Sequence, residues 1–282
     1  MINQNSSLHN QQNNFTLVFI FERAMEPILN IHPNFRDLGG IHTKSGKKVK
    51  QNRAFRSGFL GELNGNDLAK LVDLNISEIL DLRTKEEIDL TGKGNYPESI
   101  VYQNIALNTG NISKLLFPIF QKGEFHLLDP HLLNNVYLDL ITKFNDELAT
   151  IFRTILNSDK GIVFHCSHGK DRTGVISALL LDFFEVDRAH IYEDYLMSNE
   201  LLKASNEYQI QRIKDNFTAL FKREVTEEEF TPVKFLFFCQ ADLLKSVFSY
   251  LDNEYGSVAN YFQSELKLTA EELELLKSNY LE

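Results

Sequence analysis

The most informative segment of the chain is residues 162–174, which read IVFHCSHGKDRTG. Its first positions are apolar and β-branched, which indicates a buried strand. Residues 173–181, after the loop, are mainly apolar and indicate a buried helix. A loop between a strand and a helix N-terminus turns its N–H groups toward one point, where the helix dipole adds positive potential. The segment therefore predicts an anion site on a strand–loop–helix unit.

The loop carries one cysteine and, six positions later, one arginine. Helix N-termini and nearby cations stabilise a thiolate, so we expect Cys166 to be a nucleophile at neutral pH. The planar guanidinium of Arg172 can bind a tetrahedral oxyanion through two hydrogen bonds. A nucleophilic sulfur under a ring of amides, facing a phosphate held by arginine, is suited to phosphoryl transfer through a cysteinyl-phosphate.

Two other uses of the loop fit less well. A nucleotide-binding loop needs Ser or Thr after its Gly-Lys pair and Gly five positions before its last Gly. Here Asp171 follows Lys170, and position 164 is Phe. A metal site could use His165, Cys166 and His168, but a fourth ligand is not evident. We therefore predict no metal and no cofactor, because arginine and the amides supply the positive field.

The loop HCSHGKDRTG, residues 165–174, resembles the phosphate loop of the cysteine-dependent protein tyrosine phosphatases. Its Gly-Lys-Asp-Arg-Thr-Gly form is similar to that of an atypical bacterial and fungal branch, some members of which also act on phosphoinositides. The resemblance runs from about residue 30 to the end and implies an α/β fold, with a central, mostly parallel sheet flanked by helices. Further segments similar to this branch are NFRDLGG (34–40), FRSG (55–58), ILDLR (79–83), DYLMSN (194–199) and YGSV (255–258).

Roles in the loop can then be assigned. Cys166 would attack phosphorus while Arg172 and the loop amides hold the equatorial oxygens. Thr173 would direct its hydroxyl at the Cys166 sulfur and ease its departure. The resemblance implies that His165 orders the loop and does not act as a base. The remaining substrate-binding positions of the loop are Ser167, His168, Gly169 and Lys170.

The proton for the leaving group has two candidate donors. Many tyrosine phosphatases use an aspartate on a loop that opens with Trp-Pro-Asp, but this chain contains no tryptophan. The similar branch is thought to use Asp171; Asp81 is the alternative acid, or a residue that orients Arg172. Asp81 and Arg83 end a predicted strand at 76–82, and both would line the site if that strand neighbours the strand of the loop. An ordinary ion pair at the strand end is the simpler alternative.

The whole chain has 282 residues, of which 43% are hydrophobic and 24% charged, and its formal net charge is -10. We expect a disordered tail at 1–25 and a single domain at 26–282. The acidic balance argues against nucleic acid as a partner. The apolar run at 15–21 is too short to span a membrane and lacks the flanks of a secretory signal. We therefore expect a cytoplasmic protein without a transmembrane segment, although signal-less secretion stays open.

Basic residues cluster in one short stretch of this acidic chain. They could bind phosphorylated peptides or make a peripheral contact with anionic lipid, or they could form a solvated hairpin. Upstream of them, Arg36 and Asp37 could form an ion pair that pins a turn. The cluster comprises Lys44, Lys47, Lys48, Lys50, Arg53 and Arg56, and Arg56 also falls in a segment similar to the family.

Most of the remaining chain is expected to be helical. A helix at 66–74 would have Asn66 as its N-cap, and a strand is expected at 100–107. Residues 108–135 look like an insertion, either a helical lid over the site or part of the core. Cys239, among apolar neighbours, is expected to be a buried, inert thiol. Further helices are predicted at 135–157, 186–202, 206–222, 235–252 and 269–280, the last opening with a capping box, and an acidic loop at 224–229.

These features predict a phosphatase that hydrolyses phosphotyrosine, with phosphoserine, phosphothreonine and phosphoinositides as further substrates. Lys170, with His168 beside it, adds positive charge beyond what a phosphotyrosine monoester needs, so a primary phosphoinositide phosphatase is the alternative. A catalytically silent phosphate reader is disfavoured because Cys166, Asp171 and Arg172 are all present. Sulfur transfer would also use a loop cysteine, but it would need neither the arginine nor the aspartate.

Overall fold

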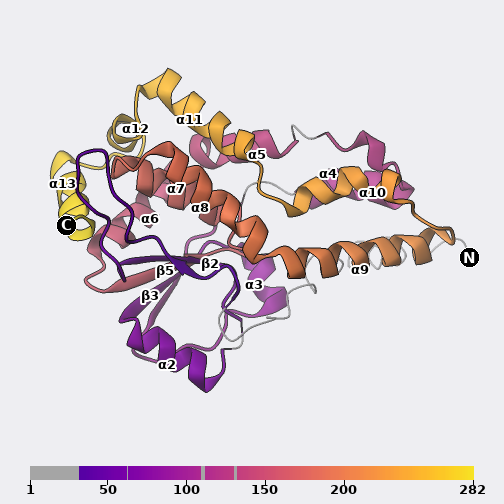
Figure 1. Ribbon diagram of the computed structural model, residues 1–282, viewed down its shortest axis with the longest axis horizontal. Coiled ribbons are helices and arrows are strands. Elements are labelled where there is room, and N and C mark those ends of the chain that lie inside the picture. Colours follow the sequence, from indigo (N-terminus) through magenta and orange to yellow (C-terminus); the bar gives the residue numbers. More distant parts are fainter. Residues whose placement is uncertain (1–31, 62, 109–111, 130–131) are drawn as a thin grey trace, which may run out of the picture.

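A five-stranded sheet forms the centre of the fold in the computed structural model, which describes residues 32–61, 63–108, 112–129 and 132–282 (Figure 1). The strand order is β1-β2-β5-β3-β4, and all neighbours are parallel except β1 and β2. This confirms the predicted α/β fold with a mostly parallel sheet. The strands are β1 (Arg36–Asp37), β2 (Ala54–Ser57), β3 (Ile76–Asp81), β4 (Val101–Asn104, shorter than predicted) and β5 (Gly161–His165).

The two faces of the sheet bury different side chains. In β5, Ile162 and Phe164 join the larger hydrophobic cluster, whereas Val163 between them joins a smaller one, because successive side chains of a strand point to opposite faces. Leu71 of α2 (Gly65–Asp73) packs in the smaller cluster. The larger cluster is closed by helices that Figure 1 shows on the other side of the sheet, including α5 (Leu132–Thr142), α6 (Asn145–Asn157) and α7 (Arg172–Phe183).

Helices make up the chain after β5, so the predicted helix-rich C-terminal half is confirmed. The last helix begins at the predicted capping box, in which Thr269 and Glu272 each accept the other's backbone N–H. Within the described ranges, no helix is both long and apolar enough to cross a membrane. The predicted tail at 1–25 lies outside the described residues. The remaining C-terminal helices are α8 (Arg188–Leu201), α9 (Lys203–Phe221), α10 (Glu227–Lys234), α11 (Ala241–Tyr255), α12 (Val258–Ser264) and α13 (Ala270–Tyr280).

A group of helices extends away from the sheet, on the right of Figure 1, and we call it the helical extension. It consists of α4 (Ile112–Lys122), α9 and α10, with the 3₁₀ turns η1 (Phe125–Leu127) and η2 (Phe235–Phe237). It has its own hydrophobic cluster, in which the rings of Phe125 and Phe217 meet edge-on at 4.9 Å between centroids. The predicted insertion at 108–135 supplies only α4 and η1, so the extension is assembled from two distant parts of the chain.

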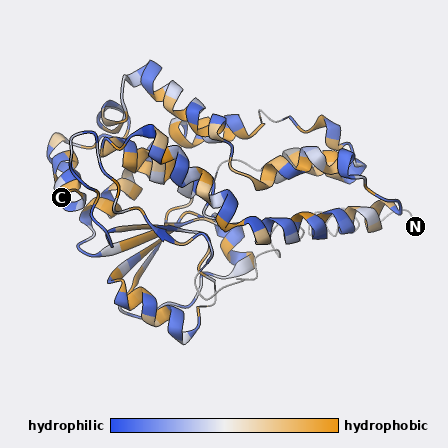
Figure 2. Ribbon diagram, in the orientation of Figure 1, coloured by the Kyte–Doolittle hydropathy of each residue, from blue (hydrophilic) through white to orange (hydrophobic). Residues whose placement is uncertain are grey.

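Helix α9 shows how the extension is built. Its buried residues are spaced three or four positions apart, so they form one stripe on the helix. Figure 2 shows hydrophilic and hydrophobic residues alternating along α9, as expected of a helix with one buried side. The stripe consists of Asn206, Gln209, Ile213 and Phe217.

Two predicted boundaries are wrong for reasons of capping. Helix α2 is capped by Asn64 and not by Asn66, because the Asn64 side chain accepts the N–H of Asp67 and completes a capping box. The acidic residues 224–229 were expected to form a loop. Instead, Thr226 caps α10 and the three glutamates after it form the first helical turn, where the helix dipole favours negative charge.

The single helix predicted at 135–157 is divided into α5 and α6. At the break, the buried Tyr261 hydroxyl lies 3.0 Å from both the Ile141 carbonyl and the Asn145 side-chain oxygen. This tertiary contact gives the Ile141 carbonyl, in the last turn of α5, a hydrogen-bond donor from another part of the chain. The local apolar pattern could not reveal that contact.

Candidate active site

The loop of residues 166–171 leaves the carboxyl end of the central strand β5, and α7 begins directly after it at Arg172. His165, the last residue of β5, pairs with Ser57 on β2 and with Asp81 on β3. The expected adjacency of the Asp81 strand and the loop strand is therefore confirmed. Both neighbouring strands end beside the loop, which is the usual place for a ligand in a parallel sheet.

The backbone of the loop is polarised. The carbonyls of residues 165–171 all accept hydrogen bonds. For example, the N–H of Leu82 donates to the carbonyl of His165 (2.8 Å), and the N–H of Phe59 donates to the carbonyl of Ser167 (2.9 Å). By contrast, the N–H groups of residues 167–171 have no acceptor within the described part of the chain. Unpaired N–H groups beside a helix N-terminus favour an anion.

Two side chains fix the middle of the loop. The amide of Asn34 donates to the carbonyls of His168 (3.0 Å) and Gly169 (2.9 Å). The guanidinium of Arg56 donates to the same Gly169 carbonyl (2.9 Å). Arg56 is fully buried and holds the loop backbone, so its position does not suit the substrate contact expected from the sequence.

A buried carboxylate on α8 holds the two arginines of this region. Asp194 accepts from Arg56 (2.5 Å) and from Arg36 (2.6 Å), and Arg36 also binds the Asn34 side chain. Burial would raise the pKa of Asp194, but the two guanidinium groups hold it below its ordinary value. The expected pair between Arg36 and Asp37 is therefore wrong, since the Asp37 carboxylate accepts backbone N–H groups instead.

Gly169 is required by both its conformation and its surroundings. Its φ is +69°, in the left-handed region that favours glycine. A Cβ at this position would lie 2.4 Å from the backbone of Ser57 and Gly58. The loop can pack against the end of β2 only because residue 169 has no side chain.

Arg172 is held by a carboxylate of α3 (Lys85–Thr91). Its two terminal nitrogens donate to the two oxygens of Glu87 at 2.7 and 2.6 Å, and Ser167 donates to Glu87 as well (2.6 Å). The Nε of Arg172 has no hydrogen-bond partner within the described ranges. One edge of the guanidinium is thus fixed, and Nε is left for a ligand.

The charges of this pair are strongly stabilised. Burial opposes ionisation of Glu87, but Arg172 and the hydrogen bonds from Arg172 and Ser167 outweigh it and lower the pKa of Glu87 to about 2. Burial likewise lowers the pKa of Arg172, yet Glu87, Cys166 and Asp171 raise it above its ordinary value. The guanidinium therefore keeps its positive charge beside Cys166.

The nucleophile lies at the base of this arrangement. Cys166 is only 3% exposed, and the Thr173 hydroxyl, also buried, has no hydrogen-bond partner in the described part of the chain. Burial lowers the pKa of His165, whose Nδ1 lies 3.2 Å from the Cys166 carbonyl. Burial and the charge of Lys170 lower the pKa of His168 to about 4. Both imidazoles are therefore neutral at pH 7, and the expected positive charge from His168 is wrong.

Asp171 and Lys170 connect the loop to surrounding helices. Asp171 precedes α7, and its Oδ1 accepts from the hydroxyl of Tyr137 on α5 (2.6 Å). The ammonium of Lys170 donates to the carbonyl of Leu236 in η2 (2.7 Å) and lies 3.6 Å from Asp171 Oδ2. Lys170 is 5% exposed, so it anchors the helical extension to the loop and is not a freely solvated charge.

Comparison with known proteins agrees with this geometry. The model of the tyrosine phosphatase family matches residues 28–282. The chain belongs to the tyrosine phosphatase family. It is 28% identical to a tyrosine-protein phosphatase of Cupriavidus necator, covering 85% of this chain and 84% of that one. It is 26% identical to the triple specificity protein phosphatase PtpB of Mycobacterium tuberculosis, covering 82% and 90%.

This tyrosine phosphatase also matches a solved structure, which is that of the core catalytic domain of the PP-IP phosphatase SIW14 from S. cerevisiae in complex with citrate. Its TM-score is 0.32 and its identity 17%, over 65% of this chain and 93% of that one.

In this tyrosine phosphatase, Asp81 and Arg83 form the ordinary ion pair that was the simpler alternative. Their side chains meet at 2.7 Å, both are buried, and the hydroxyl of Tyr102 donates to Asp81 (2.8 Å). Burial would raise the pKa of Asp81, but His165 and Arg83 bring it below its ordinary value. Arg83 also lies over the ring of Phe59, 3.7 Å from its centroid. Every side-chain nitrogen of Arg83 and both carboxylate oxygens of Asp81 already have hydrogen-bond partners within the protein.

Apart from Arg56, which supports the loop backbone, the basic cluster is remote from the phosphatase loop. Its hairpin bridges to Val186 and Leu281, beyond the carboxyl end of α7, whereas the loop precedes the amino end of that helix. The 12 residues of α7 span about 18 Å. Lys50 and Arg53 donate to carbonyls of other segments. The cluster therefore does not line the substrate site.

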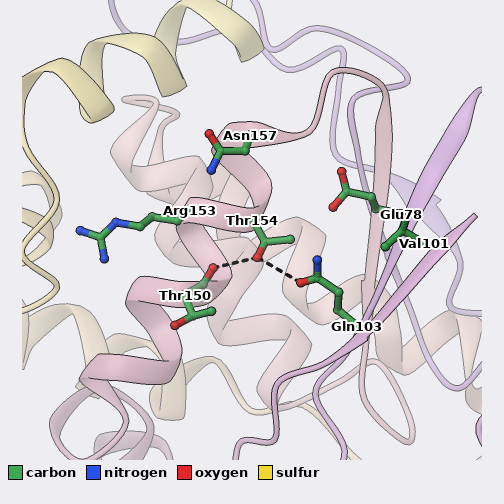
Figure 3. A pocket seen from close by; sticks show the side chains of 7 residues that line it. All are labelled: Glu78, Val101, Gln103, Thr150, Arg153, Thr154 and Asn157. Carbon is green, nitrogen blue, oxygen red and sulfur yellow. Dashed lines mark hydrogen bonds between the residues drawn. The ribbon is translucent and has the colours of Figure 1, made fainter.

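A surface hollow lies away from the loop, against β4 and α6 (Figure 3). Its residues are Glu78, Val101, Gln103, Thr150, Arg153, Thr154 and Asn157, none of which belongs to the phosphate loop. Arg153 already pairs with Glu272 of α13. The hollow therefore does not extend the phosphatase site.

Sequence reasoning missed several residues of the site. Glu87 and Tyr137 were not singled out, although the Thr-x-x-Glu spacing of Thr84 and Glu87 is a capping-box pattern and does cap α3. Asp194 and Asn34 lie in segments similar to the family, but no role was given to them. Cys239, predicted to be inert, is buried, which raises its pKa to about 12.

Proposed function

We propose that this tyrosine phosphatase hydrolyses phosphotyrosine through a cysteinyl-phosphate intermediate. The observation that carries the proposal is the row of unpaired N–H groups at 167–171, placed between Cys166 and the fixed guanidinium of Arg172. A phosphoryl group bound there would accept from the amides and from Nε of Arg172.

The reaction would proceed in two displacements. The Cys166 thiolate attacks phosphorus, the P–O bond to the substrate breaks, and the leaving oxygen takes a proton from Asp171. Water then attacks the phosphorus, the S–P bond breaks, and the thiolate leaves. The free hydroxyl of Thr173 is available to stabilise that thiolate. Asp171, now a carboxylate, accepts the proton of the attacking water.

Asp171 suits the acid role better than Asp81. The Asp171 side chain is 36% exposed, and among the described residues only its Oδ1 is bound at hydrogen-bond distance, so Oδ2 can reach a leaving group. Asp81 is fully buried and held ionised by Arg83. A carboxylate that is both ionised and enclosed cannot supply a proton to a substrate.

For substrate choice, the burial of Cys166, which is only 3% exposed, favours a phosphate on a long aryl group, because that group reaches a buried sulfur more easily than a serine phosphate does. The charge argument for phosphoinositides is weaker than the sequence suggested, because His168 is neutral and Lys170 is bound to Leu236. The Mycobacterium tuberculosis relative is named a triple specificity phosphatase, which supports more than one substrate class, so phosphoserine, phosphothreonine and phosphoinositides stay in the proposal as further substrates. We further propose that residues 108–135, whose described elements α4 and η1 pack in the helical extension, act as a lid, since Lys170 joins the extension to the loop.

The test is a panel of phosphotyrosine peptide, phosphoserine peptide and phosphoinositide vesicles, assayed with the wild type and Cys166→Ser. We expect the highest kcat/KM on phosphotyrosine, no turnover by the variant, and retained binding of the phosphotyrosine peptide to the variant. Glu86→Gln is the matched control, because Glu86 is exposed and lies on α3 next to Glu87. Phosphate release by Cys166→Ser at the wild-type rate would overturn the mechanism, and preference for the vesicles would overturn the substrate choice.

A further inference from the structure

Two buried tyrosines adjoin the carboxyl group of Asp171. Tyr137 on α5 and Tyr195 on α8 are 0% and 1% exposed. The Tyr137 hydroxyl lies 2.6 Å from Asp171 Oδ1 and 2.6 Å from the Tyr195 hydroxyl. Their rings meet edge-on at 6.4 Å between centroids. Two helices of the larger core therefore support one oxygen of the loop aspartate, α5 directly through Tyr137 and α8 through Tyr195.

We propose that Tyr137, supported by Tyr195, is a positioning residue that confines the transferable proton of Asp171 to Oδ2. The proposal rests on the proposed role of Asp171 as the proton donor. It assigns no chemistry to either tyrosine, because both are buried.

The count of hydroxyl protons supports this arrangement. Each tyrosine hydroxyl has one proton to donate. Burial and the charge of Asp171 raise the pKa of Tyr137 well above its ordinary value, and burial also raises that of Tyr195, so both keep their protons. If Tyr195 donates to Tyr137, the Tyr137 proton must go to Asp171 Oδ1. A proton taken up by Asp171 is then directed to Oδ2, which has no partner at hydrogen-bond distance within the described residues.

A fixed carboxyl orientation is what proton transfer requires. Asp171 carries no side-chain cap to α7, so within the described residues only Tyr137 and the more distant Lys170 ammonium hold it. Lys170 donates to Leu236 at 2.7 Å and lies farther, 3.6 Å, from Oδ2. The hydroxyl of Tyr137 is therefore the contact that sets which oxygen faces the leaving group.

The test compares two substrates that differ in leaving group, phenyl phosphate and nitrophenyl phosphate. One hydrogen bond to the neutral acid contributes up to about tenfold in rate, so Tyr137→Phe should lower kcat on phenyl phosphate by about 5- to 10-fold. The nitrophenyl leaving group needs little protonation, so the same variant should lose less than about threefold on it. KM should change little on either substrate. Tyr192→Phe, on the same helix as Tyr195 and outside this contact, is the matched control.

A double-mutant cycle with Asp171→Asn separates the possible failures. If Asp171→Asn slows both substrates equally, the acid assignment fails, whatever Tyr137→Phe does. The positioning role is refuted if Asp171→Asn shows the leaving-group dependence but Tyr137→Phe does not. It is also refuted if Tyr137→Phe keeps its full effect when it is made in the Asp171→Asn variant. Should Tyr137→Phe fail to fold, Tyr195→Phe must show the same dependence on phenyl phosphate, and a uniform or absent effect would refute the proposal.

Discussion

Replacing Glu87 by glutamine should disable Arg172 without removing it. The side chain keeps its size, but an amide can accept only one of the two Arg172 hydrogen bonds and carries no charge. The drop in the pKa of Glu87 from 4.5 to about 2 corresponds, at about 1.4 kcal/mol per pH unit, to roughly 3 kcal/mol of interaction. Since the side chain is 20% exposed, solvent screening reduces this to about 1 to 3 kcal/mol.

The kinetic effect follows from that magnitude. If most of the loss reaches the transition state, kcat/KM on nitrophenyl phosphate should fall by about 10- to 100-fold. The inhibition constant for vanadate should rise by a similar factor, because vanadate uses the same guanidinium. Glu86→Gln, one position away and exposed, is the control and should behave as the wild type. A Glu87→Gln enzyme within twofold of that control would refute the role of the pair.

The same variant has a defined pH signature. The folded-state pKa of Glu87 lies below its ordinary value, so its ionised form contributes stability above about pH 4.5, and this contribution is lost as the pH falls toward 2. The unfolding free energies of wild type and Glu87→Gln, measured in urea, should therefore differ at pH 7 and converge in acid. A difference that stays constant from pH 7 to pH 3 would contradict the lowered pKa of Glu87.

Three further substitutions test the loop supports. Gly169→Ala should lower the free energy of unfolding, measured in urea, by about 2 kcal/mol or more, because the added Cβ meets the Gly58 backbone. Gly46→Ala is the control: Gly46 also has a positive φ but lies in open space, so this substitution should cost only about 1 kcal/mol. Arg56→Lys should lower the free energy of unfolding by about 2 to 4 kcal/mol and should also lower kcat, because lysine cannot bind both Asp194 and the loop carbonyl. Unchanged stability would contradict the role of Arg56 in holding the loop. Lys170→Met should speed amide hydrogen exchange in α10 and the 3₁₀ turn after it; unchanged exchange there would show that the Leu236 contact does not anchor the extension.

Local sequence patterns were sufficient for the strands β3, β4 and β5 and for the loop, but not for β1 and β2. The apolar run of β5, the loop with Cys166 and Arg172, and the apolar α7 are contiguous, so their order alone places a thiol and a guanidinium at a helix N-terminus. The strand ending at Asp81 could be placed beside them because parallel strands end at the same edge.

The partners of these residues could not be predicted, because they are set by distant contacts. Arg36 pairs with Asp194, which is 158 positions away, although Asp37 is adjacent in sequence. Tyr137 reaches Asp171 from another helix. The helical extension joins α4 to α9 and α10 through phenylalanine rings whose pairing no local pattern specifies. Burial, which decides that His168 is neutral, is likewise a property of the assembled fold.

The most direct test of the account is to trap the covalent intermediate. Wild-type enzyme is mixed with nitrophenyl phosphate, quenched in acid within the first turnover, digested and examined by mass spectrometry. We expect phosphate on the peptide that carries Cys166, and no such adduct in Cys166→Ser. Steady turnover without phosphate on that peptide, or phosphate release by Cys166→Ser, would contradict the claim that the Cys166 sulfur forms a bond to phosphorus.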